Sequence, residues 1–189
     1  VILYGSSGAQ NLASYSYPPL PPRYPIAPNE SYLRYIMYPF QPDIGICIGW
    51  SSLLSADLLA IPTHGWIGMH ESLLPKRRGR APIPWAIIHG LESTGLSFFW
   101  LTEGVDDGDL FCQAPFPIGP RDTSADLLVK ANTVTRDLLL NDLLPNLKAG
   151  NLKRTPQDHS QATYCPRRTP DQGAIDFRAP ATEIDRLIR

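Results

Sequence analysis

Short apolar runs alternate with segments of helical spacing along this 189-residue chain, and this alternation constrains the fold more than any other feature. The apolar runs lie at residues 1–5 (VILYG), 43–49 (DIGICIG), 65–69 (GWIGM) and 98–101 (FFWL). Strands that alternate with helices usually form a sheet that helices wrap. We therefore expect an α/β fold with an open, mostly parallel sheet and helices on both faces.

Three segments are predicted to be helical: residues 51–59, 81–89 and 124–147. The second has Pro82 and Pro84 near its start, where a missing N–H group costs least. The third has a cap, Thr123, with Asp126 at the third helical position, and Gly150 suits its stop. Its apolar face is formed by Leu127, Ala131, Val134 and Leu138.

Residues 17–28 (YPPLPPRYPIAP) are too rich in proline for a helix or a strand. A parallel sheet needs a crossover of a dozen or more residues there, so either a proline loop replaces it or residues are missing from the sequence. Both alternatives stay open. The preceding GSSGAQ is predicted to be a plain turn rather than a phosphate-binding loop, because it lacks a third glycine and a helical pattern after it.

The composition excludes several classes of protein. No apolar run approaches the ~20 residues of a membrane span, and no signal sequence opens the chain. Cys47, Cys112 and Cys165 lie far apart without a CxxC pair, so we expect neither a disulfide framework nor a metal site, and a cytoplasmic location. A net charge of −1 makes bulk nucleic-acid binding unfavourable, so anion recognition would have to be local.

Two polar segments follow predicted strands and suggest chemistry. His70 lies in MHESLLPKRRGRAP (residues 69–82), and Asp106 lies in EGVDDGDL (residues 103–110). An isolated histidine is more often structural, and an acidic turn is by default a solvated loop. If the two side chains converge, however, the carboxylate can orient the imidazole and hold it charged. The sequence does not show convergence.

Residues 69–95 together with EGVDDGDL resemble the formyltransferase family that uses 10-formyltetrahydrofolate. That family carries an Asn-x-His-x-Ser-Leu-Leu-Pro segment, an Arg-Gly pair, a Trp-Ala-Ile helix and an Asp-x-Gly-Asp loop. The resemblance extends over residues 42–189, whereas before them only VILYG matches. It implies a Rossmann-like catalytic domain over residues 1–160. Residues 161–189 would then lead towards a C-terminal domain, since PATEIDRLIR resembles a helix that is cut short.

The resemblance also assigns site residues. His70 and Asp106 would be catalytic, with His70 donating a hydrogen bond to the oxyanion and Asp106 supporting the imidazole or relaying the proton of the amine. Ser72 joins the catalytic group, with orientation of the loop as its expected task. The folate would contact Trp50, Leu53, Leu54, Gly104 and Val105, and the acceptor would contact Gly68, Pro75, Lys76, Arg78 and Arg80.

Gly68 departs from the family pattern, which has asparagine two residues before the histidine. Losing one oxyanion donor typically costs about 2.7–4 kcal/mol of transition-state stabilisation. Three alternatives follow: a water or backbone amide replaces the donor, the protein hydrolyses formyl-folate, or it binds folate with weakened catalysis. We expect transfer to be retained, and Gly68→Asn to raise it.

The cations of KRRGR suit a phosphate-bearing substrate, although a charge run is usually a solvated surface. The later segment RRTPDQGAIDF resembles the sugar-nucleotide N-formyltransferase branch. The expected acceptor is therefore an amino sugar on a nucleotide diphosphate. Methionyl-tRNA formylation is the alternative, weakened by the lack of a broad basic surface. A homodimer is left open.

Overall fold

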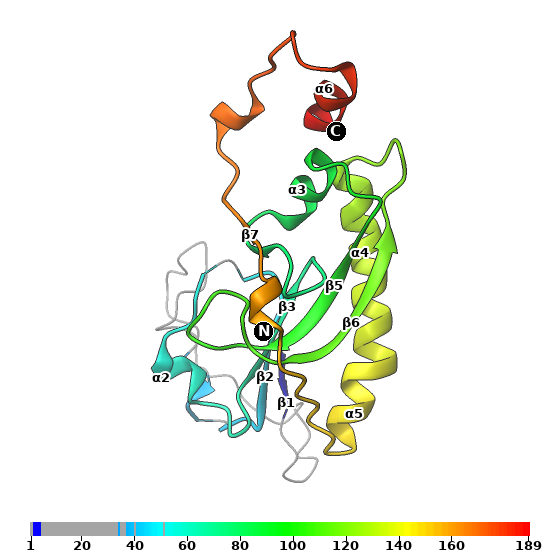
Figure 1. Cartoon of the computed structure of the whole chain (residues 1–189). Coiled ribbons are helices and arrows are strands. Elements are labelled where there is room, and N and C mark those ends of the chain that lie inside the picture. The colour runs from blue at the N-terminus through cyan, green and yellow to red at the C-terminus, as the bar shows by residue number, and fades with distance from the viewer. Residues whose placement is uncertain (1, 5–33, 35–36, 40, 51) are drawn as a thin grey trace, which may run out of the picture.

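The computed structural model describes residues 2–4, 34, 37–39, 41–50 and 52–189, so the proline-rich segment and GSSGAQ lie outside the described residues. A five-stranded sheet has the order β1-β2-β3-β5-β6 (Figure 1). Its strands are Ile2–Tyr4, Ile44–Cys47, Trp66–His70, Ser93–Trp100 and Leu110–Pro117. The α/β class is confirmed.

The expectation of a mostly parallel sheet is corrected by the strand pairing. Within the described five-stranded sheet, β2 and β3 run parallel, and the other three neighbouring pairs are antiparallel. The cause is a hairpin of β5 and β6, whose second strand the sequence did not predict. Pro115 and Pro117 hid β6, because proline cannot donate to a ladder and is tolerated in an edge strand.

One long helical segment covers one face of the sheet, as Figure 1 shows on the right-hand side. It runs as α4 (Ser124–Leu138), a π-helical turn (Leu139–Leu143) and α5 (Leu144–Lys148). The predicted cap is present, because Thr123 accepts from the Asp126 N–H and Asp126 accepts from the Thr123 N–H. The π-helical turn directly precedes Pro145, which has no N–H to continue the α-helical ladder.

The other two predicted helices differ in length. The helix α3 (Pro82–Ile88) matches its prediction and has prolines at its start. The helix predicted at residues 51–59 is reduced to α2 (Ala56–Leu59), because residues 52–55 adopt no helical structure. The chain thus follows β2 with an irregular segment rather than a helix, and Trp50, Leu53 and Leu54 lie in or next to that segment.

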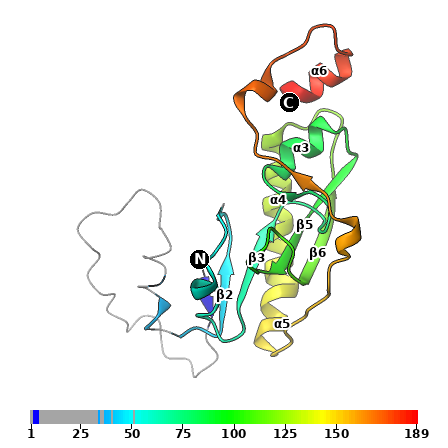
Figure 2. The same cartoon turned by 60° about the vertical axis from the view of Figure 1, so that its left-hand side comes forward.

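The C-terminal part returns to the loop after β3. Its β7 (Tyr164–Cys165) pairs in parallel with β4 (Arg78–Gly79), and short 3₁₀ turns lie at His159–Gln161 and Pro170–Gly173. The last helix, α6 (Ala181–Ile188), packs against α3. Figure 2 shows this segment running beside α3 to reach α6. The division of the chain near residue 160 stays a prediction.

Two groups of buried side chains lie on opposite faces of the sheet. The larger group joins the sheet to α3, α4 and α5, and includes Ile67, Phe98, Leu127 and Leu143. The smaller group joins the sheet to α2, and consists of Met37, Cys47, Leu54, Leu58 and Trp66. No helix in the described part of the chain is long and apolar enough to span a membrane.

Candidate active site

His70 and Asp106 converge, although 36 positions separate them in the sequence. His70 ends β3, Asp106 lies in the loop between β5 and β6, and the imidazole Nδ1 is 3.6 Å from the Asp106 Oδ2. The imidazole is buried, whereas Asp106 keeps 21% of its side chain exposed. Proton transfer between two side chains requires that they lie within hydrogen-bond distance or share one bridging water.

The second imidazole nitrogen is already engaged. The His70 Nε2 lies 2.7 Å from the backbone oxygen of Arg77. A carbonyl oxygen only accepts, so Nε2 carries the hydrogen and donates, which leaves Nδ1 for the carboxylate. In this arrangement the His70 Nε2–H is not free for the predicted donation to an oxyanion, and Nδ1 lies just beyond hydrogen-bond distance from the Asp106 carboxylate.

Unusual backbone conformations hold this pair in place. Arg77, Ala81 and Asp106 have positive φ values of 59°, 52° and 50°, in the left-handed region that non-glycine residues seldom adopt. Gly79, with φ of 96°, donates its N–H to the Asp106 Oδ2 at 2.7 Å. Backbone strain of this kind costs about 1–3 kcal/mol per residue and concentrates at functional sites.

Ser72 supports the loop from inside the protein. Its side chain is fully buried, its Oγ donates to the Lys76 backbone oxygen at 2.7 Å, and its own carbonyl accepts from the Ser97 hydroxyl. It lines neither of the two cavities described below. This arrangement supports the loop-orienting role and gives no support to a direct part in the chemistry.

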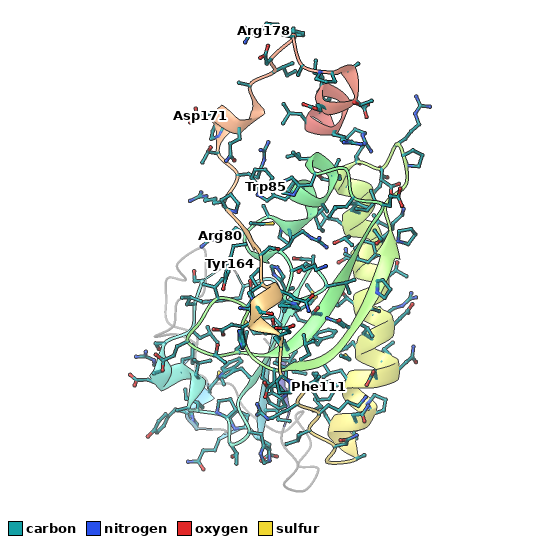
Figure 3. All side chains as sticks on the ribbon, viewed as in Figure 1. Arg80, Trp85, Phe111, Tyr164, Asp171 and Arg178 are labelled. Carbon is teal, nitrogen blue, oxygen red and sulfur yellow. The ribbon has the colours of Figure 1, made fainter. Side chains whose placement is uncertain are left out.

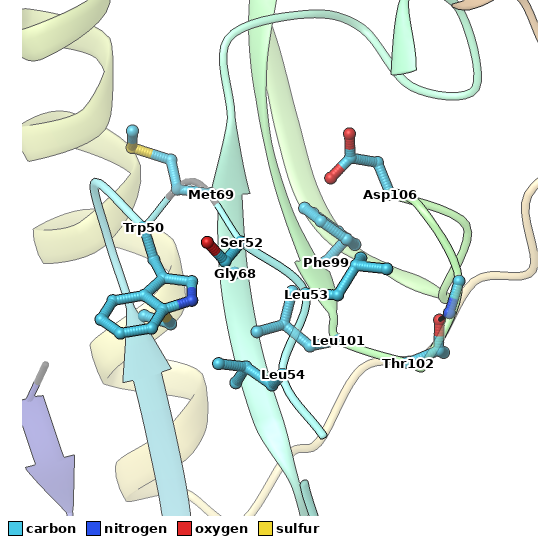
Figure 4. A pocket seen from close by; sticks show the side chains of 12 residues that line it. Trp50, Ser52, Leu53, Leu54, Gly68, Met69, Phe99, Leu101, Thr102 and Asp106 are labelled. Atoms are coloured by element: carbon cyan, nitrogen blue, oxygen red, sulfur yellow. Dashed lines mark hydrogen bonds between the residues drawn. The ribbon is translucent and has the colours of Figure 1, made fainter. Parts of the chain in front are cut away.

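An inner cavity lies beside β3, on the face of the sheet that α2 partly covers. Trp50, Leu53, Leu54 and Gly104 line it, as the resemblance predicted for the folate. Figure 4 shows Trp50 on one side of this cavity and Asp106 on the other, with Leu54 and Leu101 lower in the view. An apolar wall with a few polar groups is what a flat heterocycle needs. The remaining lining residues are Cys47, Ser52, Gly68, Met69, Phe99 and Thr102.

An outer cleft opens next to the inner cavity and contains His70. Five residues line both spaces and so mark their junction: Trp50, Ser52, Leu53, Met69 and Asp106. The cleft is also lined by Val105, by the carboxylate residue Glu71 and by three arginines, Arg80, Arg167 and Arg168. Figure 3 shows Arg80 close to Tyr164, where the two short strands β4 and β7 pair. A ligand that occupied both spaces would pass the His70–Asp106 pair.

Comparisons with known proteins agree with this geometry. A family model described as formyl transferase matches residues 27–143, which is more than half of the chain. The chain belongs to the formyl transferase family. A methionyl-tRNA formyltransferase of Myxococcus xanthus is 39% identical over 150 residues, which cover 79% of this chain and 48% of that protein. The chain spans about half the length of the curated relatives it matches.

Solved structures of formyl transferases and related proteins share the fold. HypX of Aquifex aeolicus, solved with tetrahydrofolic acid, superposes with a TM-score of 0.69 at 19% identity, covering 79% of this chain and 26% of that one. An N-formyltransferase of Helicobacter canadensis, solved with folinic acid and dTDP-3-aminofucose, gives a TM-score of 0.66 at 20% identity. Those matches cover 76% of this chain and 53% of that one.

The predicted cationic run divides into different environments, and one assignment is corrected. Arg78 is 2% exposed and its guanidinium donates to Gln157 and Tyr164, so it holds the loop to the C-terminal segment rather than contacting an acceptor. Lys76 and Pro75 do not line the cleft. Of the basic residues in KRRGR, only Arg80 lines it.

Arg167 and Arg168 were not among the predicted site residues, although the RRTPDQG segment that contains them resembles the sugar-nucleotide N-formyltransferase branch. The Arg168 guanidinium lies 5.1 Å from the centre of the Trp85 ring, and its Nη2 donates to the Gln172 carbonyl. Pairing of β7 with β4 brings both arginines to the cleft. The arginine pair that follows Cys165 after one intervening residue was the local signal that could have found them.

Gly68 lines the inner cavity, and the Leu101 side chain occupies the space that a side chain at position 68 would take. A Cβ atom at this position would lie 2.4 Å from the Leu101 Cδ2 and 3.1 Å from its Cγ. The backbone of Gly68 is ordinary extended strand, so glycine is not required there for its conformational freedom. The chain thus packs the Leu101 side chain where the family pattern has an amide side chain.

Proposed function

We propose that this protein transfers the formyl group of 10-formyltetrahydrofolate to a primary amine. The observation that carries the proposal is the His70–Asp106 pair at the meeting point of an apolar cavity and a cationic cleft. The apolar lining fits a pterin ring, and the arginines fit an anionic acceptor. Family membership supports the same chemistry.

The steps can be written with the residues of this chain. The amine lone pair bonds to the formyl carbon, and the carbonyl π electrons move to the oxygen. The attacking nitrogen gives up a proton to the His70 Nδ1 or the Asp106 carboxylate, which are close enough to share it. The carbonyl then reforms as the bond to the folate nitrogen breaks, and that nitrogen takes the electron pair and a proton. The products are a formamide and tetrahydrofolate.

An amino sugar on a nucleotide diphosphate is the acceptor we propose. Arg80, Arg167 and Arg168 line the cleft that contains His70, and guanidinium groups bind phosphate oxygens with two parallel hydrogen bonds. A nucleotide diphosphate would set its charges against these arginines and its amino sugar against the catalytic pair. The Helicobacter canadensis neighbour, which was solved with dTDP-3-aminofucose, supports this choice.

Methionyl-tRNA is the second candidate, and the curated relatives favour it. Those relatives are methionyl-tRNA formyltransferases with 37–41% identity to this chain. The same arginines would then contact the acceptor end of the tRNA. A net charge of −1 gives this chain little to attract the rest of a tRNA.

The deciding experiment supplies 10-formyltetrahydrofolate to the protein with no amine, with an amino-sugar nucleotide, or with methionyl-tRNA. Tetrahydrofolate release and the formylated acceptor are measured together. Release that depends on one acceptor supports transfer and identifies the acceptor class. Release without an amine would instead establish a hydrolase, and binding without release would establish a folate-binding protein. Size measurement in the same buffer tests the homodimer, which stays a prediction.

A further inference from the structure

Trp50 differs from the other three tryptophans in its hydrogen bonding. The indole nitrogens of Trp66, Trp85 and Trp100 each donate to a backbone carbonyl at 2.8 Å. The Trp50 Nε1 is buried and has no partner within the described residues. A buried donor without a partner is unfavourable, and a ligand atom that accepts its hydrogen bond would remove that cost.

The position of this donor indicates which ligand atom it meets. Trp50 lies at the junction of the inner cavity and the outer cleft, as does Asp106. Figure 4 shows the pyrrole edge of the Trp50 ring, which carries the nitrogen, on the side nearer β3. With the pterin in the cavity and the amine in the cleft, the formyl group that passes between them occupies this junction.

Few other side chains at the junction can donate to the formyl oxygen. Leu53 has no polar group, Asp106 accepts, and the Met69 sulfur accepts from the Thr135 hydroxyl on the α4 side of the sheet. The His70 Nε2–H is occupied by the Arg77 carbonyl, and Gly68 has no side chain. The exposed Ser52 hydroxyl is the remaining rival.

We propose that the Trp50 indole N–H is the side-chain oxyanion donor of this enzyme. As the amine bonds to the formyl carbon, the electron pair that moves to the oxygen is stabilised by this hydrogen bond, and it returns when the bond to the folate nitrogen breaks. Trp50 is then a catalytic residue, and its ring also forms a wall of the folate cavity. The proposal rests on the proposed formyl transfer.

The test replaces Trp50 by β-(3-benzothienyl)alanine, which keeps the shape of the ring and puts sulfur in place of the N–H. We expect kcat to fall about 10²- to 10³-fold, the usual loss when one oxyanion donor is removed. The KM for 10-formyltetrahydrofolate and the Kd for tetrahydrofolate, which has no formyl oxygen, should change less than about threefold, because the ring still fills the cavity. The same analogue at Trp100, whose N–H bonds to the Lys153 carbonyl away from the site, is the matched control and should keep kcat.

Each alternative outcome has a distinct signature. An unchanged kcat with weaker tetrahydrofolate binding would overturn the proposal and assign the N–H to the pterin ring. An unchanged kcat in the Trp50 variant with a 10²-fold loss in Ser52→Ala would assign the donor to Ser52. If the unmodified protein neither transfers nor hydrolyses the formyl group, the proposed function fails, and the donor role fails with it. If the unmodified protein is active and the Trp50 variant keeps the same kcat, the proposed function stands and the donor role alone is wrong.

Discussion

The two faces of β3 are covered very differently. Towards α4, Ile67 packs under a long helical segment, in a group of large apolar side chains. Towards α2, Trp66 packs under a single turn of helix, and Gly68, which has no side chain, forms part of a cavity wall. Side chains alternate between the faces of a strand, so neighbouring residues serve stability and chemistry in turn. The active site forms where the sheet is incompletely covered.

Removing the imidazole should give the largest effect on this comparison. We expect His70→Ala to lower kcat by about 10²- to 10⁴-fold, because the amine loses its proton acceptor. The protein should still fold, with a lower midpoint of thermal unfolding, because the Arg77 carbonyl loses its buried partner. Steady-state kinetics and calorimetry measure the two, with the exposed His64→Ala as control. Retained turnover would remove His70 from the mechanism.

On the face of the sheet that α4 covers, we expect a substitution to lower stability and to leave the kinetics unchanged. Leu127 is fully buried between α4 and the sheet, and Leu127→Ala should lower the free energy of unfolding by about 2–5 kcal/mol. The KM values of the remaining folded protein should not change. Denaturant titration checks this, and Leu128→Ala, at a position 48% exposed on the same helix, should cost under about 0.5 kcal/mol. A large change in KM would show that the two faces are coupled.

Gly68→Asn sharpens the comparison by adding a side chain to the open face. Because Leu101 fills the space, the single substitution should cost about 1–3 kcal/mol of stability through overpacking. The gain in transfer expected from an added amide donor should appear only when Leu101→Ala makes room. The measurement is the ratio of formylated amine to hydrolysed formate in the single and double variants. A gain in the single variant would show that Leu101 moves freely.

The smallest expected effect concerns the start of α4. The Lys130 ammonium and the Gly119 N–H both donate to Asp122, and these bonds lower the pKa of its carboxyl below the ordinary value of 3.8. A lowered folded pKa adds stability that is complete above pH 3.8 and is lost as the pH falls through the folded pKa. Asp122→Asn should therefore cost about 1 kcal/mol at pH 7.

The cost of Asp122→Asn should shrink as the pH falls from about 3.8, the unfolded pKa, through the lower folded pKa, because the carboxyl of the unsubstituted protein then becomes protonated too. Urea titrations at pH 7 and at pH 3 give the comparison. A cost that stays the same at both pH values would assign the effect of Asp122→Asn to packing instead of charge.

The convergence of His70 and Asp106 was predictable because each residue follows a strand and because the family resemblance assigns both to one site. The strand β6 was not predicted, because its prolines are atypical of a strand. The helix after β2 was predicted too long, because apolar spacing over nine residues does not distinguish a helix from a packed irregular segment. The directions of Arg78 and Arg80 were not predictable. Gly79 lies between them with a positive φ, and the backbone of this loop depends on a partner strand 86 positions away in the sequence.

The pairing of β4 with β7 sets an order of events when the chain folds. The hairpin β5–β6 joins residues that are near in the sequence, whereas Arg78 and Tyr164 are 86 positions apart, so we expect their pairing to form later. Contacts between distant residues usually form late, because they restrict a long stretch of chain at once. A newly synthesised chain would thus complete its apolar cavity before its cationic cleft. An intermediate that has already formed the folate cavity, with residues 164–168 still unpaired, would bind the donor before it could recognise an acceptor.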